Sequence, residues 1–147
     1  MKIYYYSYGS NMNQNRMLER GCIFDKVEKA KLKNYILVFN KKSQKDPSIT
    51  FANVIQKENS IVEGMLYTLD EDKIKLLDKF EGFPKHYNRI LLDVETDNGL
   101  VNAYVYIAQQ EWISNGLPSK EYLNHLLEGK NFLSENYYNM LKETVTK

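Results

Sequence analysis

The turn signal Asp97-Asn98-Gly99 restricts the possible folds of this chain more than any other feature of its sequence. An Asn-Gly pair between two strand-like stretches is typical of a tight β-hairpin, because both residues accept backbone conformations with positive φ. The flanking stretches, residues 87–95 and 100–108, are rich in β-branched and aromatic side chains, as strands are. We therefore expect them to be antiparallel neighbours in a sheet.

Other segments continue this pattern of short strands joined by turns. Strand-like runs occupy residues 3–8, 35–39, 49–55 and 61–69, and the last two are predicted to form a pair joined by Glu58-Asn59-Ser60. The chain as a whole then has six or seven strands. Because hairpins dominate and no strand–helix–strand rhythm recurs, the pattern favours an α+β domain on an antiparallel sheet, which is either open or closed into a barrel.

Helices are predicted at four places, about residues 10–18, 70–81, 118–129 and 134–144. The candidate N-caps of the first two are Ser10 or Asn11, and Thr68 or Asp70. Gly82 and Gly129 are placed to end the second and third helices. No internal repeat, low-complexity tract or flexible linker interrupts the chain, so residues 1–147 are expected to form a single domain.

Composition excludes several classes of function. Lys and Arg number 20 against 19 Asp and Glu, so no basic field is available to hold nucleic acid. Lys41, Lys42 and Lys45 form the nearest basic group, which we interpret as a solvated loop. No apolar stretch is long enough to span a membrane, and no signal peptide is evident. A single cysteine, Cys22, permits no intrachain disulfide, and the expected location is the cytoplasm.

The first candidate for a binding site is Tyr8-Gly9-Ser10-Asn11, where a predicted strand turns into a helix. Such a turn directs several backbone N–H groups and the positive end of the helix dipole at one point, where a carboxylate or an oxyanion can bind. A simple capped turn without a ligand is the alternative. A phosphate loop is disfavoured because only one glycine is present.

The second candidate is Glu81, which follows Ile74 and Leu77 at positions i+7 and i+4 of the same helix. This spacing continues the apolar stripe, so the carboxylate is expected to face inward. Desolvation raises the pKa of a buried carboxyl group toward the range that suits acid–base catalysis. A glutamate at the helix end that reaches solvent is the alternative.

The twelve tyrosines provide the third feature. Strand alternation places Asn102, Tyr104 and Tyr106 on one face and Val101 and Ala103 on the other. The tyrosine face either lines a polar ligand pocket inside a barrel or forms an outer surface or dimer contact. Which of Tyr104 and Tyr106 faces a pocket stays open at this point.

Other types of catalytic centre lack the necessary residues. Ser10 and Cys22 have no base nearby in the sequence, which argues against a nucleophilic role for either. The two histidines, His86 and His125, lie far apart in the sequence without a clustered carboxylate motif. They are a poor ligand set, and no metal site is expected.

Five segments in this order resemble the gamma-glutamylcyclotransferase-like family. They are Tyr8 to Met12 (YGSNM), Phe51 to Val54 with Val62 to Tyr67, Leu77 to Gly82 followed by Tyr87, Ala103 to Tyr106, and Pro118 to Tyr122. The resemblance covers about residues 3–129. Each motif alone is weak, but together they keep the family's order and reasonable spacing.

The resemblance implies a small, mixed and mainly antiparallel β-barrel with flanking helices, no cofactor, and a possible homodimer. It also implies release of 5-oxoproline from a gamma-glutamyl amino acid or amine. Glu81 matches the family's general acid/base and Tyr106 matches a pocket tyrosine. The substrate-binding backbone matches Ser7, Tyr8, Gly9, Ser10 and Asn11.

Two alternatives to this function remain at the level of the sequence. One is a non-catalytic small-molecule binding module on the same fold. The other is a related cyclotransferase that acts on gamma-glutamylamines or on a gamma-glutamylated biosynthetic intermediate. No residue in the sequence identifies the leaving amine.

Overall fold

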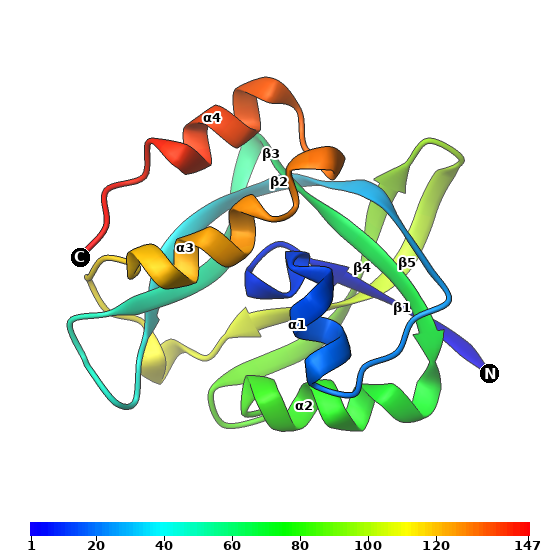
Figure 1. Ribbon diagram of the computed structural model, residues 1–147, viewed down its shortest axis with the longest axis horizontal. Coiled ribbons are helices and arrows are strands. Elements are labelled where there is room, and N and C mark those ends of the chain that lie inside the picture. The colour runs from blue at the N-terminus through cyan, green and yellow to red at the C-terminus, as the bar shows by residue number, and fades with distance from the viewer.

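Five strands close into a barrel in the order β1–β3–β2–β4–β5 in the computed structural model, which describes residues 1–147 (Figure 1). They are β1 (Lys2–Ser7), β2 (Lys26–Lys42), β3 (Thr50–Asp70), β4 (Tyr87–Thr96) and β5 (Gly99–Ala108). Neighbouring strands are antiparallel except β1 and β5, whose parallel contact places Tyr5 opposite Tyr104 and closes the barrel. The expected mixed, mainly antiparallel barrel is confirmed, with five strands in place of six or seven.

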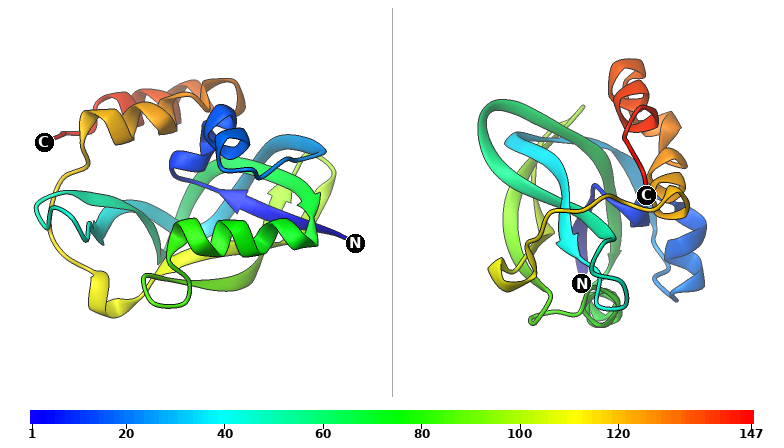
Figure 2. Two further views of the ribbon diagram at one scale, coloured as in Figure 1. Left: turned by 60° about the horizontal axis from the view of Figure 1, so that its bottom comes forward. Right: turned by 90° about the vertical axis from the view of Figure 1, so that its left-hand side faces the viewer.

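Helices cover the barrel on two sides (Figure 2). The α-helices are α1 (Gln14–Glu19), α2 (Ile74–Glu81), α3 (Lys120–Leu127) and α4 (Glu135–Lys142). The single 3-10 turns are η1 (Ser10–Met12), η2 (Glu71–Lys73), η3 (Gln110–Trp112) and η4 (Lys130–Phe132). Helix α2 lies alone along one side, whereas α1, α3 and α4 lie together over another. None of these helices combines the length and the apolar character needed to cross a membrane.

The predicted hairpin at Asp97-Asn98-Gly99 is present, with Thr96 paired to Gly99 at its closed end. The predicted end of α2 is also correct, because Gly82 adopts a left-handed conformation with φ of 68°. Helix α3 begins after Ser119, whose hydroxyl accepts a hydrogen bond from the N–H of Tyr122 at 3.0 Å. These three features depend on short-range sequence signals alone.

The predicted pair of strands over residues 49–55 and 61–69 is wrong, because β3 runs unbroken through Glu58-Asn59-Ser60. β2 pairs with β3 along its length, and a register shift lies between Lys33 and Tyr35. Asn34 and Asn59 both have positive φ there, and Asn34 Oδ1 accepts the N–H of Asn59 at 3.1 Å. The left-handed residues therefore bend two long strands instead of reversing the chain.

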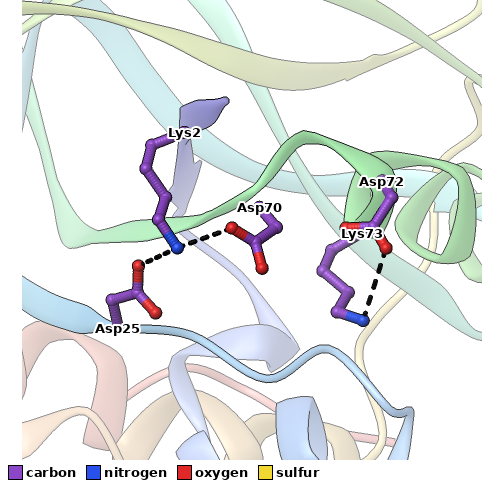
Figure 3. A network of polar contacts seen from close by, with 5 residues as sticks. All are labelled: Lys2, Asp25, Asp70, Asp72 and Lys73. Carbon is purple, nitrogen blue, oxygen red and sulfur yellow. Dashed lines mark hydrogen bonds and ion pairs between the residues drawn. The ribbon is translucent and has the colours of Figure 1, made fainter.

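The first predicted N-cap is also wrong, because Asn13 and not Ser10 or Asn11 caps α1. Residues Ser10–Met12 form a separate 3-10 turn. Asp70 precedes η2 but its side chain makes no capping hydrogen bond. Its carboxylate instead lies 2.5 Å from the ammonium of Lys2, which also pairs with Asp25 (Figure 3). Lys2 therefore joins one end of the β1–β3 ladder to the loop before β2.

The core consists of two apolar clusters, one inside the barrel and one between the barrel and its helices. The inner cluster contains only residues of strands and of the loop after β1, among them Tyr6, Leu66, Ala103 and Val105. The outer cluster combines residues of all four helices or their adjoining turns with strand residues, among them Tyr106. The tyrosine face of β5 is therefore the outer face of the barrel, beneath α2, and not its interior.

Candidate active site

A cavity of about 500 Å³ opens where β1, β2 and α2 end. The residues predicted for a site all line this one cavity, although they come from separate parts of the chain: Ser7, Tyr8, Gly9, Ser10, Asn11, Glu81 and Tyr106. Tyr104 does not line it. A cavity of this size is in the range of small-molecule sites.

The loop from Tyr8 to Asn11 presents unpaired backbone groups at the cavity. The N–H groups of Tyr8 and Gly9 donate no hydrogen bond to other parts of the protein. They are therefore available to a ligand that carries an oxyanion or a carboxylate. The expected helix dipole is not a substantial contribution, because η1 is a single turn and α1 begins only at Gln14.

Gly9 has a structural reason to be glycine that the sequence did not reveal. A Cβ at this position would lie 3.2 Å from the hydroxyl oxygen of Tyr122 and 3.4 Å from Cβ of Ala52. That hydroxyl accepts the N–H of Ala52 at 3.1 Å, so α3 is tied to the start of β3 directly behind the loop. The close approach that glycine permits here is to Tyr122.

Asn11 fixes the loop through its side chain and its carbonyl group. Its amide nitrogen donates to the hydroxyl of Tyr5 at 3.0 Å, and its Oδ1 accepts from Arg20 at 3.0 Å. Its carbonyl oxygen accepts a hydrogen bond from the Tyr67 hydroxyl at 2.6 Å. Tyr5 stacks on Tyr67 with ring centroids 6.0 Å apart. The loop is thus held in one shape before any ligand binds.

Glu81 is the last residue of α2, and its carboxylate accepts no hydrogen bond within the protein. Burial raises the pKa of this carboxyl group, while the positive charges of Arg20, Arg16 and Lys41 oppose the increase. The side chain faces the cavity, as its position on the apolar stripe predicted. An unpaired carboxylate in a cavity with a raised pKa is suited to accept and return a proton.

Asp78, one turn before Glu81, has a different environment. Its Oδ1 accepts the hydroxyl of Tyr106 at 2.7 Å, and its Oδ2 pairs with Arg89. Asp78 does not line the cavity. It attaches α2 to β4 and β5, and it holds the Tyr106 side chain in place. Tyr104, by contrast, lies under the guanidinium of Arg89 at 5.1 Å.

Five lysine and arginine side chains line the cavity: Arg16, Arg20 and Lys41, together with the exposed Lys45 and Lys79. The sequence identified none of them as a site residue. Arg16 lies in α1, and Arg20, four residues later, is the C-cap of this helix. Neither forms an ion pair with a carboxylate. Lys41 is only 4% exposed. Its predicted place in a solvated loop is wrong, because β2 extends to Lys42. Their contribution could be found only from the fold, since lysine and arginine are common on solvated surfaces.

No three histidine, cysteine, aspartate or glutamate side chains lie close enough together to hold a metal ion. Cys22 is buried, does not line the cavity, and has its pKa raised by burial.

The family model described as "Gamma-glutamyl cyclotransferase, AIG2-like" matches residues 5–129, and the chain belongs to this family. This finding confirms the resemblance drawn from the motifs. Membership in the family supports cyclotransferase activity in general. No curated protein matches the sequence.

Solved structures show the same fold at low sequence identity. A structure named gamma-glutamyl cyclotransferase has a TM-score of 0.89 and 22% identity, over 100% of this chain and 90% of that one. An uncharacterised protein from Homo sapiens has a TM-score of 0.85 and 24% identity, over 99% and 89%. A yeast gamma-glutamyl cyclotransferase described as specific to glutathione has a TM-score of 0.73 and 13% identity, over 98% and 95%.

Proposed function

We propose that this protein releases 5-oxoproline from gamma-glutamyl compounds, with Glu81 as its general acid and base. One observation carries the proposal. The unpaired carboxylate of Glu81 shares a cavity with the free N–H groups of the Tyr8–Asn11 loop. A proton acceptor and an anion-binding backbone are the two parts that this reaction requires from a protein.

The reaction needs no nucleophile from the protein. The substrate's α-amine attacks its own γ-carbonyl carbon, a five-membered ring closes, and the bond from that carbon to the leaving amine breaks. Well-oriented intramolecular reactions of this kind reach effective molarities of about 10⁵–10⁸ M. The main task of the site is therefore to hold the glutamyl part in the conformation that closes the ring.

Glu81 moves the protons that the reaction requires. The α-amine is protonated in solution and must lose a proton before it can attack. The ionised Glu81 carboxylate takes that proton and later gives one to the departing amine. The attacking nitrogen loses a second proton after ring closure, when it becomes the lactam N–H, and that proton leaves with the released amine as its ammonium form. Its raised pKa brings it closer to the pH of the solution, which favours transfer in both directions. Such catalysis contributes about 10²–10⁴-fold.

The glutamyl α-carboxylate is assigned to the loop and to the cations beside it. The N–H groups of Tyr8 and Gly9 are free, and Arg20 is fixed next to them through Asn11. Arg16 also lines the cavity, and its Nε is buried without a hydrogen-bond partner. A bound carboxylate would satisfy donors that otherwise stay unpaired.

The test is to incubate the protein with a panel of gamma-glutamyl dipeptides and gamma-glutamylamines and to measure 5-oxoproline by mass spectrometry. We expect release from at least one class, and its loss in the Glu81→Gln variant. A folded parent protein that binds members of the panel but releases no 5-oxoproline from any of them would instead be a binding module on this fold.

A further inference from the structure

Lys41 is a buried cation at the cavity, and the mechanism above does not use it. Only 4% of the residue is exposed, yet it forms no ion pair with any carboxylate. Lysine is almost never this deeply buried without such a partner. A buried ammonium group that faces a cavity without an acidic partner indicates that an anionic ligand group binds there.

The local structure holds this side chain in position. A bulge at Asn40 shifts the register of β2 against β3, so that Lys41 lies opposite Phe51. Bulges near functional sites change the direction in which the following side chains point. The Lys41 ammonium lies 2.8 Å from Nδ1 of His86 and 4.6 Å from the centre of the Trp112 ring, and His86 stacks on Trp112 with centroids 3.9 Å apart. One contact with His86 leaves ammonium hydrogens for a further acceptor.

Lys41 is separate from the arginines beside the loop. Arg16 contacts His125 and Arg20 contacts Asn11, whereas Lys41 contacts His86 and Trp112. The two arginines and Lys41 therefore have different neighbours at the cavity, and the positive charges of all three act on Glu81. Burial lowers the pKa of Lys41 to about 8, so the ammonium remains mostly charged at pH 7.

A gamma-glutamyl amino acid has a matching pattern of charges. One carboxylate belongs to the glutamyl part and a second to the leaving amino acid, with the scissile amide between them. A gamma-glutamylamine whose amine carries no acid lacks the second charge. The arginines and the loop suit the first carboxylate, and Lys41 suits the second.

We propose that Lys41 is a specificity-determining residue that binds a carboxylate on the leaving amine, so that gamma-glutamyl amino acids are preferred over uncharged gamma-glutamylamines. This inference rests on the proposed function, because it assigns the far end of the same substrate. Glu81 then lies beside the amide bond that breaks, with an anchored carboxylate on either side of it.

The experiment compares gamma-glutamyl-alanine with gamma-glutamylethylamine, which differs only in having hydrogen in place of the second carboxylate. We expect the parent protein to favour the dipeptide in kcat/KM by about 10- to 100-fold, the range of one charge-assisted hydrogen bond. Lys41→Met should remove this preference by lowering kcat/KM for the dipeptide alone. Lys41→Arg should retain part of it, because the positive charge remains.

Lys42→Met is the matched control, since it removes the neighbouring charge of β2 outside the cavity. It should leave the preference unchanged. Equal activity of the parent toward both compounds would overturn the role of Lys41 without any variant. An equal loss for both compounds in Lys41→Met would do the same, because it would indicate a structural or proton-transfer role. Absence of 5-oxoproline from both compounds, by contrast, would contradict the proposed function itself.

Discussion

Glu81→Gln separates the chemistry of the site from its structure, because glutamine keeps the shape of the side chain but cannot accept the proton of the amine. Loss of general acid–base catalysis should reduce turnover by about 10²–10⁴-fold, which corresponds to about 2.7–5.4 kcal/mol in the activation free energy. Binding of a gamma-glutamyl ligand should persist, since the Tyr8–Asn11 loop is unchanged. Turnover of any gamma-glutamyl substrate by the variant at the parent rate would refute the role of Glu81.

Glu81→Gln should increase the stability of the fold at pH 7 although it reduces turnover. The pKa of Glu81 is raised in the folded state because burial disfavours the ionised form. Such a group contributes stability below its unfolded pKa and loses that contribution as the pH rises through its folded pKa. Glutamine removes the buried charge, so the variant should unfold at higher denaturant concentration than the parent at pH 7. The difference should disappear in acid, where Glu81 is protonated in both states.

Asp78→Asn is the control for this experiment, one helical turn away. Asparagine keeps an acceptor for Tyr106 but loses the ion pair with Arg89, which joins α2 to β4. Hydrogen bonds to charged groups contribute about 1.5–3 kcal/mol, and the partly exposed Arg89 should bring the loss toward the lower end. The free energy of unfolding should fall. The pH at which kcat/KM declines in acid should stay the same, because Glu81 is unchanged in this variant.

The acid limb of the pH profile provides a further prediction: kcat/KM should fall as the pH drops through a pKa above the ordinary glutamate value, and this limb should be absent in Glu81→Gln. Gly9→Val should weaken ligand binding and also lower the melting temperature, since its side chain displaces Tyr122, and a calorimetric scan beside a binding titration would detect both. Arg16→Met should raise KM by about tenfold with a smaller effect on kcat, as expected for a charged contact to substrate. Activity should survive excess chelator, and native Cys22 should resist alkylation because it is buried; loss of activity on chelation that a divalent ion restores would contradict the scheme.

Local signals predicted the parts of the fold that depend on a few adjacent residues. The hairpin at residues 97–99 and the left-handed end of α2 at Gly82 are of this kind. The prediction of a chain-reversing turn at Asn59 was wrong. The residue does adopt a left-handed conformation, but it lies within β3, which pairs with β2 on both sides of it. Long-range pairing overrode the local preference, and no pattern within residues 58–60 carries that information.

The candidate site also combines residues that local sequence signals identify and residues that only long-range contacts place there. Glu81 and the loop after β1 were found because helical spacing and a strand end are visible in the sequence. Lys41 was assigned to a solvated loop, because its burial depends on a bulge in β2 and on contacts with His86 and Trp112, which are distant in sequence. Arg16 and Arg20 have helical spacing too, but only the barrel determines that this face of α1 meets a cavity.

The strand order of the barrel has a consequence for how the chain folds. β1, which leads into the substrate loop, pairs with β3 and β5 and not with β2, the next strand in the sequence. One edge of β1 therefore stays unpaired until residues 65–70 of β3 have been synthesised, and the other until Tyr104 of β5 has been synthesised. Contacts between such distant residues slow folding, and unpaired strand edges favour aggregation in the meantime. Synthesis of this protein should thus be sensitive to chaperone supply, and activity should appear only after nearly the whole chain has emerged.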